Sequence, residues 1–301
     1  MAAVALIVNA GSGGAREAPD ATLLRTLCHR HGLDAEVHLV PAGGNVDDAI
    51  EQALATGAGT LVAAGGDGTV NAVAARALEH DRVLGVLPLG TLNHFARDLD
   101  IPLELEAAVA ALASAVERRV DVGLVNDRIF LNNASIGLYA TIVVDRERQQ
   151  RRLGRGKWHA LLRATLVALR EPDALELALE VDGRELRRRT PFLFVGNNDY
   201  EVQGPAAGQR ARLDDGRLSL YVLHACTAWG LVWLALRTLV RGTARARDLD
   251  TFAATRLDVQ ARAPRLPVAR DGEVDELTTP VRFSVRPGAL RVLAPAPEAA
   301  P

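Results

Sequence analysis

The sequence has few cysteines and almost no net charge, and these shortages argue against several classes of function. Only two of its 301 residues are cysteine, Cys28 and Cys226, and neither stands in a CxxC or Cys/His spacing. A thiolate metal site and a disulfide framework are therefore disfavoured, and a reducing cytoplasm is the expected compartment. The formal net charge is −2. The chain thus has no bulk field to attract nucleic acid, and any basic site must be local.

Long apolar runs are also missing. The N-terminal run 4–8 is short and follows no charged region, which favours a buried strand over a signal peptide. The apolar stretch 225–240 is interrupted by Arg237 and is shorter than the roughly 18 to 20 residues that a membrane span needs. We therefore expect a cytoplasmic protein, with peripheral contact to a membrane surface left open.

The first third of the chain alternates strand and helix patterns. A continuous apolar run predicts a buried strand over residues 4–8, and further strands are predicted over residues 35–40, 60–64 and 83–88. Periodic apolar residues predict helices capped by Asp20 (with Leu23, Leu24, Leu27 and Cys28 on one face) and by Asn45, and further helices over 70–78, 91–99 and 102 to about 118. Repeated βα units imply an α/β domain, here residues 1–119, whose parallel sheet binds ligands at the carboxyl ends of its strands.

The pattern changes near Val120, where short β-like runs begin. These runs cover residues 120–125, 129–133, 174–181, 193–196, 218–223 and 257–260, and Asp182-Gly183 predicts a hairpin turn. Two helices interrupt them, at about 145–170 and 227–241. We expect an antiparallel, sandwich-type β domain over 120–280. Residues 281–301 contain two terminal strands, which can belong to either domain, and a disordered tail.

Three glycine-bearing turns each follow a strand of the first domain: residues 9–14 (NAGSGG), 65–69 (GGDGT) and 88–93 (PLGTLN). A parallel sheet brings these turns to one edge, and glycine lets backbone N–H groups approach phosphate oxygens. Helices after the second and third turns direct their positive ends to the same place. The predicted nucleotide-binding residues are Asn9, Ala10, Gly11, Ser12, Gly13, Gly65, Gly66, Asp67, Gly68, Thr69, Gly90, Thr91 and Asn93.

Asp67 is an acid inside a site built for anions. A divalent cation held against the nucleotide phosphates explains it, so we predict that Asp67 supports Mg²⁺. One glycine-rich turn would say little, because such turns are ordinary after strands, but three at one edge favour nucleotide binding. The sequence contains neither a GxxxxGK[ST] loop nor a GxGxxG with an acid about 20 residues later.

The segment GGDGT, followed by PLGTLNHFARDL, resembles the catalytic domain of the diacylglycerol kinase family, which includes sphingosine kinases and bacterial lipid kinases. Later segments share the resemblance: residues 132–137, 195–198, 213–218 and 271–273. It implies a phosphofructokinase-like nucleotide domain that binds ATP, and phosphorylation of a lipid hydroxyl in a cleft between domains. Two positions depart from the family pattern, Ala10 where a proline is usual and His94 where an aspartate is usual.

The resemblance also supplies acids for the acceptor side. A kinase needs a base or a positioning acid for the attacking hydroxyl. Asp271 and Glu273 of the DGE segment are the catalytic candidates, with the choice between them left open; without the resemblance, DGE would be an ordinary turn. In the bacterial lipid kinases an acid that matches Asp215 holds a structural Mg²⁺, which here makes Arg212 and Arg217 candidate carbonyl donors.

Two clusters predict membrane contact. The first is basic: arginines and a lysine within 146–157 precede Trp158. The second is apolar and lies at 229–234. Solvated helix faces and core packing are the alternative for both.

The leading interpretation is an ATP- and Mg²⁺-dependent lipid kinase with a diacylglycerol-like or sphingoid acceptor. The alternatives are a kinase for NAD or a sugar phosphate, and a non-catalytic protein that binds a nucleotide or a lipid. A homodimer is left open, because C-terminal strand edges can pair between chains.

Overall fold

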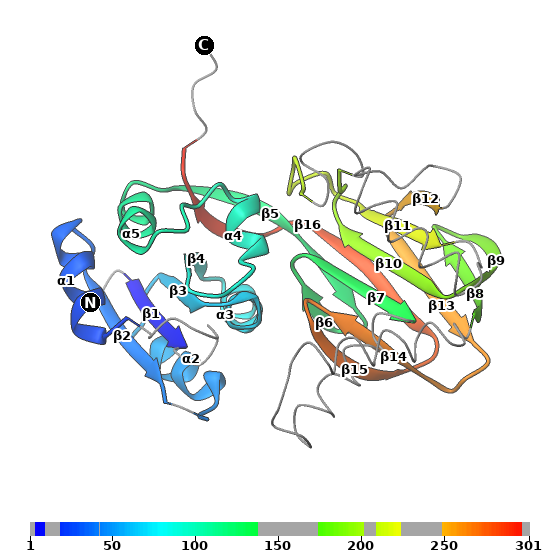
Figure 1. Cartoon of the computed structure of the whole chain (residues 1–301), viewed down its shortest axis with the longest axis horizontal. Coiled ribbons are helices and arrows are strands. Elements are labelled where there is room, and N and C mark those ends of the chain that lie inside the picture. Colours follow the sequence, from blue (N-terminus) through cyan, green and yellow to red (C-terminus); the bar gives the residue numbers. More distant parts are fainter. Residues whose placement is uncertain are drawn as a thin grey trace, which may run out of the picture. The chain divides into compact units, whose positions relative to one another are not determined.

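The chain folds into two compact units (Figure 1). The computed structural model describes residues 4–9, 19–41, 43–137, 174–201, 209–223 and 249–296. The N-terminal unit comprises residues 1–122 and 287–301, and the C-terminal unit comprises residues 123–286. The predicted helices 145–170 and 227–241, and both clusters expected at a membrane, lie outside the described residues.

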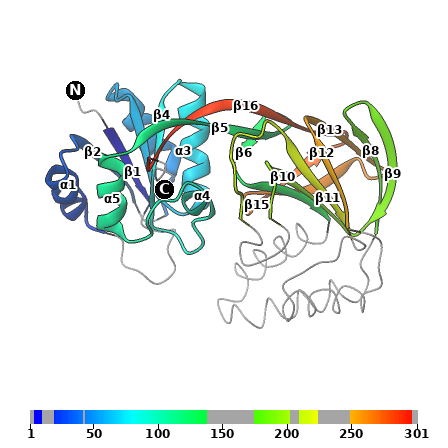
Figure 2. The ribbon, with the colours of Figure 1, turned by 90° about the horizontal axis from the view of Figure 1, so that it is seen from above.

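The N-terminal unit is a parallel sheet covered by helices. Its strands pair in the order β2-β1-β3-β4, with bounds β1 Val4–Asn9, β2 Ala35–Val40, β3 Thr60–Gly65 and β4 Val83–Pro88. The helices are α1 Ala21–Arg30, α2 Val46–Ala55, α3 Asp67–Glu79, α4 His94–Asp98 and α5 Leu105–Ala113. Helix α1 packs beside α5 (Figure 2), and α2 packs beside α3 (Figure 1). The predicted α/β domain with a parallel sheet is confirmed.

The predicted caps of α1 and α2 are present. The Asp20 carboxylate accepts the Thr22 N–H at 3.3 Å, and the Asn45 amide oxygen accepts the Asp47 N–H at 3.1 Å. These bonds satisfy donors that a helix N-terminus leaves unpaired. Of the four residues expected on the buried face of α1, three are buried, but Leu23 is 47% exposed.

Three helices differ from the expected ranges. Helix α3 begins at Asp67, three residues early, so GGDGT supplies its first turn. Helix α4 begins only at His94, because Asn93 has a φ of 52° in the left-handed region. Helix α5 is shorter than the predicted 102–118: the Glu104 carboxylate caps it by accepting the Ala107 N–H at 2.8 Å, and the chain has already entered strand β5 at Val116.

The C-terminal unit is built from antiparallel strands in two layers (Figure 1). One layer has the order β12-β11-β10-β7-β14-β15, and the other contains β16-β13-β8-β9. Large buried side chains such as Phe130, Leu257 and Phe283 form one core with residues of both layers. The expected sandwich-type domain is confirmed. The strand bounds are β5 Val116–Val125, β6 Arg128–Phe130, β7 Asn133–Gly137, β8 Leu175–Val181, β9 Arg184–Thr190, β10 Phe192–Asn197, β11 Leu218–Leu223, β12 Leu249–Ala254, β13 Arg256–Ala261, β14 Arg265–Arg270, β15 Glu273–Thr278 and β16 Val281–Ala294.

Two connections between strands of this unit can be compared with the sequence prediction. Asp182 and Gly183 have φ values of 45° and 82°, which closes the predicted two-residue hairpin between β8 and β9. The expected single strand 129–133 is instead split, with β6 ending at Phe130 and β7 starting at Asn133. The split occurs because the backbone N–H groups of residues 131–133 turn toward the Asp271 carboxylate.

Strand β16 contributes to both units. Its residues 281–284 pair with β13 in the C-terminal unit, and Val292 pairs with Leu84 of β4 in the N-terminal unit. The two terminal runs expected at 281–285 and 290–293 are therefore one strand. In the part of the chain that the structure describes, no helix has the length and apolar character required to cross a bilayer.

Candidate active-site residues

The second and third glycine turns lie backbone to backbone. Strand β3 ends at Gly65, whose carbonyl accepts the Leu89 N–H at 3.0 Å. A Cβ on Gly90 would overlap the Gly66 Cα. A side chain at position 90 would therefore push the two turns apart, and glycine is required there. The structure thus brings together two of the three turns in which sequence reasoning placed the nucleotide.

Asn93 holds the third turn closed. Its side-chain oxygen accepts the Gly90 N–H at 3.0 Å, and its side-chain nitrogen donates to the Gly90 carbonyl at 2.9 Å. The residue is 8% exposed and adopts a left-handed conformation that asparagine tolerates better than most residues. Asn93, predicted as an amide donor to phosphate, therefore uses both ends of its amide inside the turn. Its neighbours Thr91 and His94 are exposed.

Asn9 links the first turn to α3. Its side-chain nitrogen donates to the Thr69 hydroxyl oxygen at 3.1 Å. Thr69 is 4% exposed and lies in the first turn of α3, and a Cβ on Gly65 would stand 2.7 Å from its side chain. The end of β1 is thus tied to the start of α3. The other predicted residues of the first turn, Ala10, Gly11, Ser12 and Gly13, lie outside the described residues.

Asp67 has an unsatisfied carboxylate oxygen at the N-terminus of α3. Its Oδ1 atom is buried, and within the described ranges it has no hydrogen-bond partner. The helix has no side-chain cap at this end. Buried polar atoms rarely lack a partner, so an unpaired carboxylate oxygen here fits a bound cation or a hydroxyl donor. The donor chemistry of Asp67 is therefore compatible with Mg²⁺ bound to nucleotide phosphates.

Asp271 uses its carboxylate to hold a turn. Its Oδ2 accepts the Leu131 N–H at 2.7 Å, while its Oδ1 accepts the N–H groups of Asn132 and Asn133 at 2.9 and 3.1 Å. Its own N–H donates to the Asn133 carbonyl at 3.0 Å. Burial raises the pKa of the Asp271 carboxyl, against the opposing effect of these three N–H groups and of the Arg210 guanidinium. Both oxygens are thus engaged with the backbone.

Arg210 fixes the same turn from the other side. This 5% exposed residue donates to the carbonyls of Leu131 and Asn197 at 2.7 and 3.1 Å and to the Asn132 side-chain oxygen at 2.8 Å. Its guanidinium carbon also lies 5.5 Å from the centre of the Tyr200 ring. Sequence reasoning missed Arg210, because nothing in its local sequence separates it from the chain's many other arginines.

Glu273, the other acid of the DGE segment, accepts none of the hydrogen bonds from residues 131–133 that engage Asp271. Its side chain is 65% exposed, and its ion pair with Arg270 is long at 3.7 Å. The left-handed Asp271, with a φ of 45°, and Gly272, with a φ of 90°, carry the chain from β14 into β15, where Glu273 is the first residue. Of the two candidate bases, Glu273 is therefore the one with a carboxylate open to a ligand.

The predicted metal residues near Asp215 have protein partners in the structure. The Arg212 guanidinium lies 3.3 Å from the Asp215 carboxylate, and the Arg217 carbonyl accepts the Asn198 N–H at 3.0 Å. Among the described residues there is no cluster of three or more His, Cys, Asp or Glu side chains suited to a metal. The predicted site uses one carboxylate and backbone carbonyls rather than such a cluster, so the metal roles of Asp215, Arg212 and Arg217 stay a prediction.

Comparisons with known proteins fit this geometry. Residues 3–125 match the diacylglycerol kinase catalytic domain, and residues 134–294 match the YegS C-terminal NAD kinase beta sandwich-like domain. The chain belongs to the diacylglycerol kinase catalytic-domain family. The first match contains all three glycine turns and the second contains Asp271 and Glu273, so the resemblance recognised from these motifs is confirmed.

Individual relatives agree over most of the chain. A protein of Pseudomonas aeruginosa strain UCBPP-PA14, named "Probable lipid kinase YegS-like", is 36% identical over 88% of this chain and 86% of its own length. A protein of the same name from Pseudomonas fluorescens Pf-5 is 33% identical over 88% and 87%. A structure described as a diacylglycerol kinase from Bacillus anthracis strain Sterne has a TM-score of 0.68 at 19% identity, and covers 97% of this chain and 96% of its own. The chain is thus a member of a lipid kinase family, and a kinase of this family uses a nucleotide as substrate.

Proposed function

We propose that this protein transfers the γ-phosphate of ATP to the hydroxyl group of a lipid. The observation that carries the proposal is the buried Oδ1 atom of Asp67 at the N-terminus of α3, which has no hydrogen-bond partner among the described residues. A helix N-terminus attracts phosphate, and a carboxylate oxygen beside it can bind a cation that accompanies the anion. A nucleotide bound together with a divalent cation meets both conditions.

In this proposal the N-terminal unit binds and orients the phosphates. The backbone of residues 65–69 and 90–93 is rigid, because Gly90 packs on Gly66 and Asn93 closes its own turn. Rigid N–H groups and the helix dipole stabilise charge without reorganising during the reaction. When bound, Mg²⁺ would supply charge neutralisation for the phosphates, and Asp67 is the residue whose chemistry fits it.

On the acceptor side we assign different roles to the two acids. Glu273 accepts the proton of the acceptor hydroxyl at its exposed carboxylate, because that carboxylate is free to meet a ligand. Asp271 positions the DGE turn through the three backbone N–H groups that it accepts, and Arg210 supports that turn from the other side. Phosphoryl transfer depends mainly on positioning and charge neutralisation, so both roles affect the rate.

The acceptor is proposed to be a lipid on the strength of the relatives' names. A diacylglycerol-like or a sphingoid lipid offers the primary hydroxyl that this chemistry needs. The enzyme is then expected to work in the cytoplasm at a membrane surface.

The test is product identification. The protein is incubated with total bacterial lipid, radiolabelled ATP and Mg²⁺, and the products are separated into lipid and aqueous fractions and identified by mass spectrometry. We expect a phosphorylated lipid, and we expect Asp67→Asn to abolish its formation while the circular dichroism spectrum stays unchanged.

Other outcomes would point elsewhere. Label that appears only in NAD or in a sugar phosphate would replace the lipid acceptor with a soluble one. ATP binding without transfer to any acceptor would make the protein a nucleotide-binding protein without kinase activity. Normal turnover by Asp67→Asn would show that Asp67 does not support the cation.

A further inference from the structure

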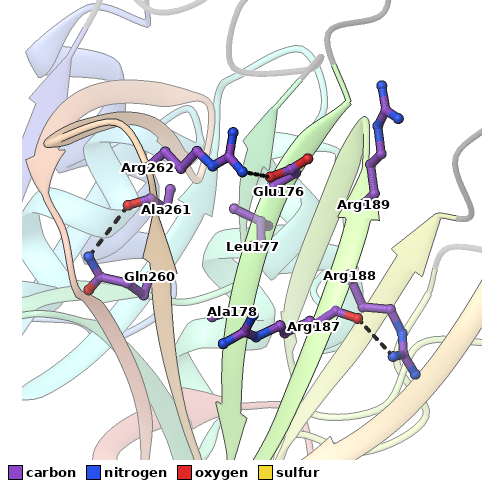
Figure 3. A pocket seen from close by; sticks show the side chains of 9 residues that line it. All are labelled: Glu176, Leu177, Ala178, Arg187, Arg188, Arg189, Gln260, Ala261 and Arg262. Carbon is purple, nitrogen blue, oxygen red and sulfur yellow. Dashed lines mark hydrogen bonds and ion pairs between the residues drawn. The ribbon is translucent and has the colours of Figure 1, made fainter.

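The outer face of strands β13, β8 and β9 carries a basic hollow of about 440 Å³ (Figure 3). It lies wholly within the C-terminal unit and contains none of the residues assigned above to ATP or to the acceptor hydroxyl. Strand β9 is the edge of its sheet. The lining residues are Glu176, Leu177, Ala178, Arg187, Arg188, Arg189, Gln260, Ala261 and Arg262.

Strand register explains why a hollow forms here. Ala178 pairs with Gln260 of β13 on one side and with Arg187 of β9 on the other. Paired residues on adjacent strands point to the same face, so two long side chains flank one methyl group. Figure 3 shows Arg187 extending over Ala178. The small residue is thus the floor and the long side chains are the walls.

The charges in the hollow do not balance. The Glu176 carboxylate pairs with Arg262 at 2.9 Å and lies opposite Arg189 in the strand register, so one acid faces two guanidinium groups. Arg188 pairs with Asp250 at 3.0 Å. Within the described parts of the chain, neither Arg187 nor Arg189 has an acidic partner.

The next row along the same face has the opposite character. Glu180 lies between Asp258 of β13 and Glu185 of β9. Asp258 is paired there with Arg256 at 3.3 Å and with Arg282 at 3.9 Å. The excess positive charge is therefore confined to the end of the face that holds the hollow, and an anion would be directed to that end.

We propose that this hollow, formed around Ala178 by Arg187, Arg189 and Arg262, binds the headgroup phosphate of an anionic phospholipid and so attaches the protein to a membrane surface. A guanidinium presents paired N–H donors that match two phosphate oxygens, and it is more weakly hydrated than an ammonium. The aliphatic parts of the arginine side chains supply apolar surface beside the headgroup. The choice of a lipid over a soluble phosphate rests on the proposed lipid kinase function.

The test is co-sedimentation of the full-length protein, without ATP, with vesicles of phosphatidylglycerol and phosphatidylcholine or of phosphatidylcholine alone. We expect binding only to the anionic vesicles. An arginine near an anionic surface contributes roughly fivefold to binding, so Arg187→Gln combined with Arg189→Gln should lower the partition coefficient about 25-fold. The difference in binding between the unchanged protein and this double variant should disappear in 1 M salt, where the Debye length is about 3 Å.

Two control variants use the same sheet face. Arg256→Gln combined with Arg282→Gln removes the same charge from arginines beside the acidic row of Asp258, Glu180 and Glu185, and should lower binding less than threefold. Glu176→Gln releases Arg262 and should raise binding roughly threefold to fivefold. A gain with anionic vesicles but not with phosphatidylcholine alone is not explained by aggregation of misfolded protein, so the proposal stays testable if the double variant is unstable.

The proposal is overturned if both double variants lose binding equally, since bulk charge would then be responsible. It is also overturned if the Arg187/Arg189 variant binds anionic vesicles normally. Binding of glycerol 3-phosphate that depends on Arg187 and Arg189, without vesicle binding, would assign the hollow to a soluble phosphate and likewise overturn the lipid assignment. A protein that binds vesicles as expected but phosphorylates no lipid would refute the proposed function and leave the hollow intact.

Discussion

At the scale of single residues, two neighbouring acids of the same turn have different surroundings. Asp271 has three backbone N–H groups on its two oxygens, whereas Glu273 has a mostly exposed carboxylate with one distant arginine. A carboxylate that already accepts three backbone hydrogen bonds has about one lone-pair site left, so its main role is positioning. The local geometry thus separates roles that the sequence left open.

This separation predicts opposite effects on activity and stability. Glu273→Gln should lower kcat by about 10²- to 10⁴-fold, which is the usual contribution of a general base, and should leave the melting temperature unchanged. Asp271→Asn should lower the free energy of unfolding by about 1–3 kcal/mol, because its amide leaves at least one N–H of the 131–133 turn unsatisfied. Steady-state kinetics and urea denaturation measure the two effects. If Asp271→Asn loses activity at unchanged stability while Glu273→Gln stays active, the two roles are exchanged.

How far residues could be predicted depended on where their partners lie. Asp67 could be selected from the sequence, because an acid in a glycine-rich turn is unusual, and its role at the phosphates stays a prediction. Arg210 could not, because its partners Leu131, Asn132 and Asn197 come from distant parts of the chain. It is one of 35 Lys and Arg residues, so its type gave no reason to select it.

At the scale of elements, the proposed phosphate-binding region depends on the contact between the start of α3 and the turn before α4. That contact has no space for a side chain at Gly90, since a Cβ would overlap Gly66 and lie 2.8 Å from the Asn93 side-chain oxygen. The turn would have to move away from α3, and the N–H groups of the two segments would no longer converge.

We therefore predict that Gly90→Ala weakens ATP binding at least tenfold. Isothermal titration calorimetry with ATP and Mg²⁺ measures the change. Gly59→Ala is the matched control, because a Cβ at that exposed glycine meets no atom within 4 Å. Unchanged ATP affinity in Gly90→Ala would show that the two turns do not act together on the nucleotide.

Predictions of elements succeeded where the signal was local. The caps Asp20 and Asn45 and the apolar runs of β1, β3 and β4 placed most of the N-terminal unit. The end of α5 was wrong, because the apolar pattern continues past Ala113. What ends the helix is the pairing of β5 with β16, which lies more than 150 residues further along the chain. Long-range strand pairing overrode the local pattern.

At the scale of the whole molecule, β16 makes the two units share one element. Phe283 is fully buried in the core of the C-terminal unit, while Leu290 and Val292 are fully buried in the N-terminal unit. Strand β5, which pairs with β16, likewise begins in the N-terminal unit and ends in the C-terminal unit. If one end of this pair opens, the other end loses part of its support.

We predict that Leu290→Ala destabilises both units, although Leu290 is buried in only one. Removing a fully buried leucine should lower the free energy of unfolding by about 2–5 kcal/mol. Hydrogen–deuterium exchange with mass spectrometry should show this loss in strands β1 and β3 and also in strands β10 and β13. Arg286→Ala lies at an exposed position on the same strand. It should change the free energy of unfolding by no more than about 0.5 kcal/mol, in β1 and β3 as well as in β10 and β13. Faster exchange confined to β1 and β3 would mean that the units unfold independently. In that case β16 would be a connection between two separate folding units, with no energetic coupling between them.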